Sequence, residues 1–420
     1  MGHTSRQARR NTMPGPVGNE PNGRTIRRRT ARNMGTRPGG RWGAIPYILV
    51  VWCVSRVILI GIGMGARSWV GYGPGSKIVQ DKIGTGFAWL DIWSAWDSYW
   101  YYSIADVGYL ASPVVVDGYN AWAFFPLYPW VARAVAAVVG NLYIAALLVS
   151  NISLLIGAWA LYNLVQHLHD DAMARKAVLF LFLFPAGYAL SCLLTEGLFF
   201  VLTVGAWYCA RQHHWLLAGL LGMASAMTRL VGLFMAPLLA LEYLRQRQWH
   251  IIRIRPDALW IGLVPIGLVV FMAVCYTLTG NPLQFVEAQD VWGVRENPLW
   301  TLWSSLERAW HERFSRWDGV LGNGYGALAA IVAAGVLLWG RKQIGTLLCF
   351  WSLAQILISL AANIRAIQSM PRHLAVIFPL FMILASLRTK SVAFVITVVV
   401  LSLLQAATFA LWTMGWVVAV

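Results

Sequence analysis

Residues 89–129 read WLDIWSAWDSYWYYSIADVGYLASPVVVDGYNAWAFFPLYP, and this stretch decides how the rest of the chain is interpreted. In a helix, at 100° per residue, four of its tryptophans fall within about 60° of one another: Trp89, Trp93, Trp96 and Trp100. Asp97 lies at the edge of this tryptophan stripe. Because tryptophan favours the boundary between membrane and water, the stretch predicts an interfacial helix that holds one carboxylate at the depth of the lipid headgroups.

The composition is that of a membrane protein. The 420 residues are 58% apolar and 12% charged, and 23 of them are tryptophan, which is far outside the range of soluble domains. The formal net charge is +16, but the positive charge is concentrated in the N-terminal tail and in short loops, as cytoplasmic retention of Lys and Arg predicts. We therefore expect an integral, multi-pass membrane protein with membrane lipids, and no nucleic acid, as partners.

The first segments of the chain set its orientation. Residues 1–41 contain no apolar run and many arginines, so we expect a disordered, basic, cytoplasmic tail ahead of a transmembrane domain over 42–420. The first span is expected at 45–66. Its Arg56 either has a paired or functional role inside the bundle or extends along the helix toward the headgroups. A chain that starts inside emerges outside, so 67–121 is the first outside loop.

The later apolar stretches define the remaining crossings. Residues 124–140 are short and interrupted by Pro and Arg133, which predicts an interfacial or partly inserted helix. If they do not cross, the further candidate spans are 142–165, 177–188, 196–210, 215–227, 231–244, 259–279, 327–339, 344–362, 374–387 and 392–412. Several of these are shorter than a simple crossing needs, so we expect helices that end at a recessed cavity.

The positive-inside rule supports this arrangement. Every loop that it places inside is basic, the relevant residues being Arg175, Lys176, Arg211, Arg245, Arg247, Arg253, Arg255, Arg341, Lys342, Arg388 and Lys390. The rule therefore predicts about eleven crossings, a cytoplasmic N-terminus and an outside C-terminus.

A long outside loop is expected over 280–326. In it Trp303, Trp310 and Trp317 recur every seven residues, with Leu306 and Phe314 on the same face. This pattern predicts a second interfacial helix, so the outer surface would carry aromatic helices beside a polar opening.

Asp97 is the candidate catalytic base. A carboxylate beside an apolar stripe, at the mouth of a cavity, is partly desolvated and can accept a proton from a sugar hydroxyl. The alternative is that Asp97 caps the helix or pairs with Arg229 or Arg372. Tyr101, one turn later, could hydrogen-bond it. Asp106 would lie on the opposite side of an unbroken helix, so the two carboxylates are not expected to form a close dyad.

Two arginines are candidate ligands of a lipid-linked phosphate. Arg229 and Arg372 lie at the outer ends of spans, and guanidinium pairs bidentately with phosphate; the alternative is that they anchor to lipid headgroups. Glu196 follows the break at Pro185, where it either complements a helix N-terminus or hydrogen-bonds sugar hydroxyls. The five cysteines lie in or beside apolar stretches without metal-type spacing, and we expect no metal site.

The run WDSYWYYSIADVGY, followed by AWAFFPLYP, resembles the PIG-V family of mannosyltransferases, whose eukaryotic members add the second mannose in glycosylphosphatidylinositol synthesis. Three further segments agree with that family in order and spacing: FPAGYALSCLLTEGLFF, WLLAGLLGMASAMTRLVGLFMAPLLALEY and PRHLAVIFPLFMILA. The resemblance covers most of 89–385. His373 departs from it, because the family pattern has tyrosine there. The compact loops indicate a bacterial member.

The resemblance implies a GT-C fold with its catalytic acidic residue, here Asp97, in the first outside loop, and a polyprenyl-phosphate sugar as donor. No cofactor or metal is expected, because arginines can neutralise the departing phosphate. The candidate substrate-binding residues are Tyr101, Asp106, Tyr109, Glu196, Arg229, Arg372 and His373.

These inferences predict an inverting membrane glycosyltransferase of the bacterial plasma membrane, with its active site outside. It would move mannose from polyprenyl-phosphate mannose to a lipid-linked or surface glycan. Two alternatives stay open: a transporter or flippase of a lipid-linked sugar, although no repeat at half-length is visible, and a non-catalytic subunit of a glycosylation complex. The sequence does not determine the oligomeric state.

Overall fold

The computed structural model describes residues 1–2, 43–71, 73–111, 119–293, 296–312, 320–362 and 367–416. The chain divides into Met1–Trp42 and Gly43–Val420, and the helices described below belong to the second unit. The predicted disorder of 1–41 concerns residues of which only the first two are described. Phe314 and Trp317 of the second predicted interfacial helix also lie outside the described residues.

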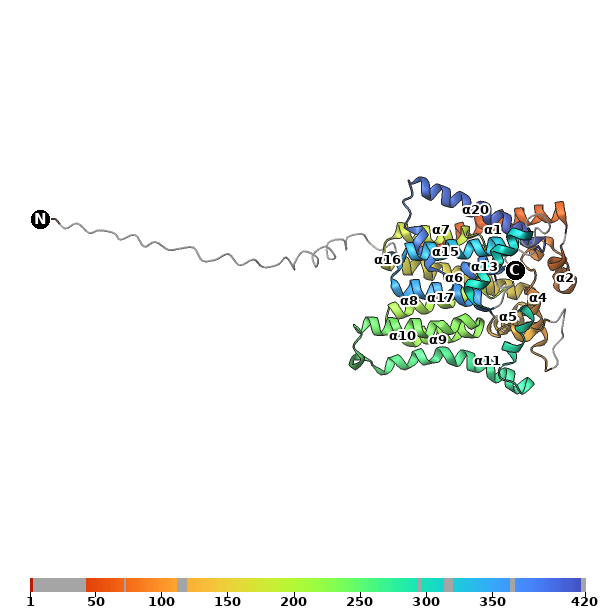
Figure 1. Cartoon of the computed structure of the whole chain (residues 1–420), viewed down its shortest axis with the longest axis horizontal. Helices are drawn as coiled ribbons and strands as arrows, with labels where there is room; N and C mark the ends of the chain where they lie inside the picture. Colours follow the sequence, from red (N-terminus) through yellow and green to blue (C-terminus); the bar gives the residue numbers. More distant parts are fainter. Residues whose placement is uncertain are drawn as a thin grey trace. The chain divides into compact units, whose positions relative to one another are not determined.

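Apolar runs fold into α-helices, and the described residues contain no β-strand (Figure 1). The helices of ten residues or more are α1 (Ala44–Val70), α2 (Pro74–Ile83), α4 (Ser98–Val107), α5 (Leu127–Val139), α6 (Leu142–Leu168), α7 (Asp171–Leu183), α8 (Glu196–Arg211), α9 (Trp215–Thr228), α10 (Met235–Gln246), α11 (Leu263–Thr279), α13 (Pro298–Glu312), α15 (Tyr325–Trp339), α17 (Thr346–Ala362) and α20 (Val392–Thr413). The shorter ones are α3 (Ala88–Asp91), α12 (Gln284–Glu287), α16 (Arg341–Ile344), α18 (Met370–Ala375) and α19 (Pro379–Ala385).

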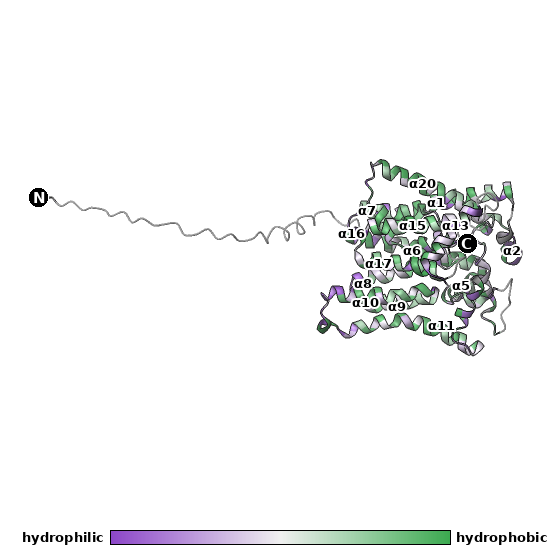
Figure 2. Cartoon of the chain, viewed as in Figure 1, coloured by the Kyte–Doolittle hydropathy of each residue, from purple (hydrophilic) through white to green (hydrophobic). Residues whose placement is uncertain are grey.

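Within the described residues, five helical segments are long and apolar enough to cross a membrane: Ala44–Val70, Leu142–Leu168, Pro256–Thr279, Gly322–Trp339 and Val392–Thr413. Shorter apolar helices include α5, α9 and α17. In Figure 2 hydrophobic residues dominate along the long helices, and hydrophilic ones gather toward their ends. The predicted all-α, multi-pass membrane fold is confirmed, as is a short helix within 124–140, whereas the number of about eleven crossings stays a prediction.

The helices pack in a connected series (Figure 1). Helix α6 contacts α5, α7 and α8; α8 contacts α9, α9 contacts α11, and α1 contacts α20. Asn141, Asp170 and Ser391 cap the starts of α6, α7 and α20, each accepting a hydrogen bond from the backbone N–H three residues later. These capped helices pack against one another and hold the shorter segments between them in place.

The prediction of one continuous interfacial helix over the tryptophans at 89–100 is wrong. Helix α3 ends at Asp91 and α4 begins only at Ser98, so the four tryptophans share no single helical face. Trp89 is 51% exposed, whereas Trp93 and Trp100 are buried. Trp96 has φ 49°, a left-handed conformation that a bulky side chain rarely adopts and that ends any helix passing through it.

The second predicted interfacial helix is present as α13. Its buried residues are Thr301 and Ser305. The opposite face carries exposed apolar side chains at helical spacing: Leu299, Trp303, Leu306 and Trp310. An aromatic face left open beside membrane-type helices fits a helix lying in the plane of a bilayer.

A break between α7 and α8 interrupts the bundle. Phe184 is extended (φ −62°, ψ 139°), as the following Pro185 requires. The carbonyls freed by the break are bound from α20, where Gln405 donates to the carbonyls of Phe182 and Phe184 and Thr408 donates to that of Pro185. Irregular backbone inside an apolar bundle needs such partners.

Candidate active site

Four of the residues predicted for the site meet in one ionic cluster. Asp97 precedes α4, Glu196 opens α8, Arg229 follows α9 and Arg372 lies on α18. They come from four separate parts of the chain, and we call them the ionic cluster.

The cluster is a chain of alternating charges. Arg372 Nη2 donates to Asp97 Oδ2 at 2.7 Å, and Arg372 Nε lies 2.9 Å from Glu196 Oε1. Arg229 Nη1 donates to the same Glu196 oxygen at 2.8 Å. The alternative of a pair between Asp97 and Arg372 is therefore present. Asp97 occupies the N-cap position of α4 but makes no capping hydrogen bond with its side chain.

The cluster is almost completely removed from solvent. The side chain of Glu196 is 1% exposed, and those of Arg372, Asp97 and Arg229 are 7%, 13% and 16% exposed. Charges buried to this extent must compensate one another. Three atoms of the cluster have no hydrogen bond among the described residues: Glu196 Oε2, Arg372 Nη1 and Arg372 Nε, although Nε is ion-paired with Glu196. Because buried polar atoms are normally satisfied, such atoms mark a place for a ligand or water.

The loop before α4 is held where Asp97 can reach the cluster. The N–H of Leu193, in the break, donates to the carbonyl of Trp93 at 3.0 Å. Tyr143 of α6 donates to Ser94 Oγ at 2.8 Å. The left-handed backbone of Trp96 then turns the chain into α4 directly at Asp97. The break and the loop thus fix each other, and each carries one carboxylate of the cluster.

Glycine permits the close approaches that place Glu196 and Arg229. A Cβ on Gly197 would lie 2.5 Å from the carbonyl oxygen of Leu190, and one on Gly232 would lie 2.2 Å from that of Ser225. Contacts this short exclude any side chain at these two positions. The guanidinium of Arg229 also lies over the ring of Phe199, 5.9 Å from its centroid, which restricts its orientation.

Tyr101 lies close to the cluster. Burial raises the pKa of Tyr101 above its ordinary value, and the neighbouring Arg229 lowers it by less. Its hydroxyl therefore stays protonated and available as a hydrogen-bond donor. Thr195, which the sequence analysis did not single out, lies beside Tyr101 and lowers its pKa by a smaller amount.

His373 adds a neutral group beside the two arginines. Burial, and then Arg229 and Arg372, hold the pKa of His373 well below its ordinary value. The ring is therefore uncharged at neutral pH, and its buried Nδ1 has no hydrogen-bond partner among the described residues. Its place next to Arg372 fits the predicted substrate-binding role.

The structure does not bring Asp106 and Tyr109 into the cluster. The side chain of Asp106 is exposed at the far end of α4, where Arg133 binds the carbonyls of Ala105 and Asp106. Tyr109 stacks on Trp122 with 4.7 Å between ring centroids and donates to the carbonyl of Phe124. Roles for these two residues in substrate binding stay predictions.

Arg56 is buried inside the bundle and does not extend to the headgroups. It donates to Ser191 Oγ at 2.7 Å and lies over the ring of Trp93, 5.5 Å from its centroid. Of the two alternatives for Arg56, the paired one is present. Since Ser191 belongs to the break, Arg56 supports the segment that leads to Glu196.

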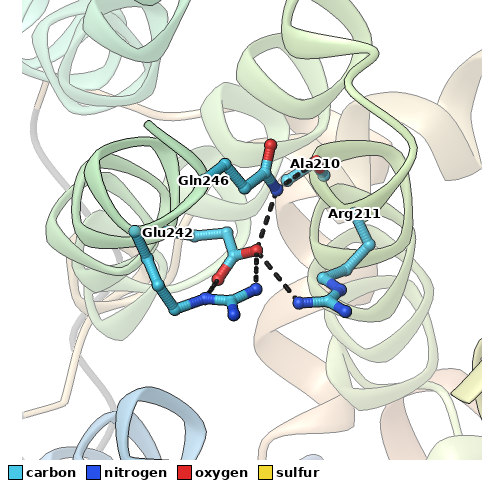
Figure 3. Close-up of polar contacts among 5 residues, drawn as sticks. Ala210, Arg211, Glu242 and Gln246 are labelled. Atoms are coloured by element: carbon cyan, nitrogen blue, oxygen red, sulfur yellow. Dashed lines mark hydrogen bonds and ion pairs between the residues drawn. The ribbon is translucent and has the colours of Figure 1, made fainter. Parts of the chain in front are cut away.

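A second buried ionic group was missed by the sequence analysis (Figure 3). Glu242 of α10 accepts two hydrogen bonds from Arg245 at 2.7 Å each, one from Gln246 at 2.8 Å and one from Arg211 of α8 at 3.2 Å. It lies at the end of α10 remote from Arg229. The signal in the sequence was a carboxylate at the end of an apolar run, three residues before an arginine.

No group of three or more His, Cys, Asp or Glu side chains suited to a metal ion occurs in the part of the chain that the structure describes. The cysteines have no disulfide there. The site itself supplies carboxylates, guanidiniums, a phenol and an imidazole.

Comparison with known proteins gives a distant structural likeness. Neither protein-family models nor curated proteins match the chain. Among solved structures it is similar to the Archaeoglobus fulgidus oligosaccharyltransferase in its complex with Zn and sulfate (13% identity, TM-score 0.43) and in the apo form (11%, 0.47). It is also similar to that enzyme tethered to an acceptor peptide (11%, 0.41). These likenesses cover 86%, 90% and 87% of this chain, which spans 53%, 56% and 55% of the archaeal one.

Proposed function

We propose that this protein is a membrane glycosyltransferase of the GT-C type that moves a sugar from a polyprenyl-phosphate donor to a hydroxyl of a lipid-linked or surface glycan. The ionic cluster of Asp97, Glu196, Arg229 and Arg372 carries the proposal. The resemblance to the PIG-V family makes mannose the first sugar to test.

The two arginines suit a lipid-linked phosphate. Arg229 is the most exposed member of the cluster, at 16%, so its free N–H groups are open to an incoming anion. Arg372 Nη1 is buried and unsatisfied. One guanidinium group can donate two parallel hydrogen bonds to a phosphate, and its positive charge stabilises the negative charge that develops on a departing phosphate.

Phosphate binding and base activation are coupled through Arg372. Burial lowers the pKa of Arg372, but Glu196 and Asp97 outweigh this and hold it above its ordinary value. The guanidinium is therefore permanently charged. Arg372 occupies Oδ2 of Asp97 with a hydrogen bond of 2.7 Å. A donor phosphate that attracts Arg372 would release this oxygen, so that Asp97 can accept a proton only when the donor is bound.

The reaction follows as a single displacement with inversion. Asp97 accepts the proton of the acceptor hydroxyl as its oxygen attacks the anomeric carbon. A new glycosidic C–O bond forms, and the bond between the sugar and the phosphate oxygen breaks. The electron pair leaves with the polyprenyl phosphate, whose charge is held by Arg229 and Arg372. Since the arginines neutralise this charge, we expect a chelator to leave transfer unchanged.

The surroundings of the cluster suit two lipid-linked substrates. Helix α13 presents an exposed face of tryptophan and leucine, and the described chain has helices long and apolar enough to cross a membrane. Polyprenyl chains can stay in the bilayer while their headgroups enter the polar region.

The test is transfer of radiolabelled mannose from polyprenyl-phosphate mannose into a lipid extract by the purified protein. Wild type is compared with Asp97→Asn, which keeps the shape of the side chain, and with Asp81→Asn on the exposed side of α2 as matched control. We expect transfer by wild type and by the control, and a loss of about 100-fold or more in Asp97→Asn.

Equal transfer by Asp97→Asn and wild type would remove Asp97 as the base. No transfer by folded wild type from any polyprenyl-phosphate sugar, with a broad pool of acceptors, would overturn the proposed reaction. Movement of the labelled lipid across a vesicle membrane without transfer would instead support a flippase.

A further inference from the structure

The loop between α10 and α11 combines arginines with exposed apolar side chains. It runs over residues 247–262 and contains the short helical turns Ile251–Arg253 and Pro256–Gly262. It follows the C-terminal end of α10, whereas Arg229 of the ionic cluster lies before the N-terminal end. Twelve residues of helix separate these ends, a distance of about 18 Å. The loop is therefore remote from the proposed active site.

A cavity of about 340 Å³ opens in this loop. Its lining includes Arg247, Arg253 and Arg255, with Gln248, Ile252 and Ile254 between them. Three guanidinium-bearing residues around one cavity make a region of positive charge, and the size is within the range of small-ligand sites.

The positive charge of the cavity is only partly compensated. Arg247 lies 3.5 Å from Asp257, a loose ion pair. Arg253 donates at 2.7 Å to the neutral amide of Gln248. The backbone N–H of Arg255 donates to Tyr243, but no carboxylate pairs with its side chain among the described residues. The cavity thus has a net affinity for an anion.

Apolar side chains surround the charged cavity. Ile252 is 99% exposed and Ile251 is 76% exposed, and Trp249 next to them is 57% exposed. Leu259 and Trp260, at the start of the segment Pro256–Thr279 that is apolar enough to cross a membrane, are 78% and 43% exposed. Isoleucine, leucine and tryptophan together at an exposed loop indicate contact with the acyl chains and the headgroup boundary of a bilayer.

The backbone of the loop is conformationally strained at two residues. Gln248 and Trp249 both have positive φ, 58° and 62°, which is unfavourable for side chains of this size. The start of the loop is fixed by Glu242, which binds Arg245 and Gln246 immediately before it (Figure 3). Strain retained beside a cavity of this kind points to a function for the shape.

We propose that this loop is a binding site for an anionic phospholipid. The phosphate of the headgroup occupies the cavity between Arg253 and Arg255, and the acyl chains lie along Ile251 and Ile252. Inorganic phosphate could bind the arginines but would leave the isoleucines without an apolar partner. A neutral lipid could cover the isoleucines but would leave the positive charge of the arginines uncompensated. Under the predicted topology the site faces the cytoplasmic leaflet, where anionic lipid attracts basic segments. The proposal is independent of the proposed transferase activity.

The experiment titrates the purified full-length protein, in neutral detergent, with phosphatidylglycerol or phosphatidylcholine and counts bound lipids by native mass spectrometry. The first variant combines Arg253→Gln and Arg255→Gln. Its matched control combines Arg341→Gln and Lys342→Gln, which removes the same charge from another exposed basic segment. A second variant combines Ile251→Ser and Ile252→Ser and leaves the charge unchanged.

We expect wild type to retain phosphatidylglycerol in preference to phosphatidylcholine. The arginine variant should bind phosphatidylglycerol about 30-fold more weakly, because each of the two charges near a lipid surface contributes about fivefold to the affinity. The isoleucine variant should also bind it more weakly, and the control should match wild type. All four proteins should unfold at the same temperature, because the altered side chains are exposed.

Three results would overturn the site: equal binding by the arginine variant and wild type, an equal loss in the Arg341 and Lys342 control, or displacement of the lipid by an equimolar amount of inorganic phosphate. The last would show an anion site without a lipid.

Discussion

Arg372 donates a hydrogen bond of 2.7 Å to Asp97, although 275 positions separate the two residues in the chain. The pair joins the first outside loop predicted from the sequence to a short helix near the end of the chain. It is the contact on which the proposed coupling between donor binding and base activation depends.

The pair should be detectable as a coupling in stability. Asp97→Asn and Arg372→Gln each leave a buried charge without its partner, and we expect each to lower the free energy of unfolding by about 3 kcal/mol. The double variant should lose less than the sum, by about 1–3 kcal/mol. Denaturant unfolding of the four proteins in one detergent measures this. Strict additivity would mean that the two residues do not interact in solution.

Glu196 should act by positioning the arginines, since its Oε1 contacts both. Glu196→Gln keeps the size and one acceptor oxygen but removes the charge that orients Arg229 and Arg372. We expect kcat to fall by about 100-fold, as misplaced groups do in other enzymes, with a smaller change in the KM for the donor. A rise in KM alone, with kcat unchanged, would instead assign Glu196 to donor binding.

His373 should make the protein sensitive to mild acid. Its pKa is lowered in the folded state, so the unfolded chain binds the proton more readily and stability is lost as pH falls below the ordinary value of about 6.5. The loss from this group approaches about 1.4 kcal/mol per pH unit. Between pH 7.5 and 5.5, His373→Gln should lose less stability than wild type. His250→Gln, at an exposed site, should behave as wild type; if His373→Gln does so too, the assigned shift is wrong.

Close packing at the start of α8 predicts opposite results for one substitution at two glycines of the same helix. A Cβ at position 197 would meet the carbonyl oxygens of Leu190 and Ser150 at 2.5 and 2.8 Å. At position 205 it would meet only the side chain of Leu221, at 3.2 Å. Gly197→Ala should therefore destabilise the protein by about 1–3 kcal/mol and reduce transfer, whereas Gly205→Ala should be neutral or slightly stabilising. Thermal unfolding separates the two, and similar values would show that the backbone at α8 yields easily.

The members of the cluster could be selected from the sequence because an ionisable residue in an apolar chain has few roles. Asp97, Glu196, Arg229 and Arg372 were selected on that ground. A pair between Asp97 and Arg229 or Arg372 was one predicted alternative, but the choice of Arg372 and the shared contact of both arginines with Glu196 could not be predicted, because they depend on which helix ends meet in space. Helical periodicity describes only one face of one helix at a time. The structure therefore adds the order of the charges and the atoms of Glu196 and Arg372 that lack a hydrogen bond.

The prediction of a helical tryptophan stripe was wrong for a related reason. The spacing of the four tryptophans predicts one helix that runs through Asp97, whereas Asp97 itself is a residue that often precedes the first residue of a helix. The sequence does not decide between a helix that continues through Asp97 and one that begins after it. Contacts outside the stripe decide between them. The buried carboxylate of Asp91 accepts hydrogen bonds from Thr85 and Gln80, upstream of α3, and Trp93 is bonded through its carbonyl to Leu193. These partners end the helix early, and nothing in the local pattern encodes them.

The hydrogen bonds from α20 to the break have a consequence for how the protein is made. Gln405 and Thr408 satisfy the carbonyls before and at Pro185, and Arg372 supplies the partner of Asp97. While a ribosome is still translating the region after α17, Glu196 and Arg229 are already inserted, but the break has no partner from α20 and Asp97 has no cation beside it. A nascent chain stalled at that point would hold Glu196 paired with Arg229 and Asp97 unpaired, so the ionic cluster is completed only after Arg372 has been synthesised.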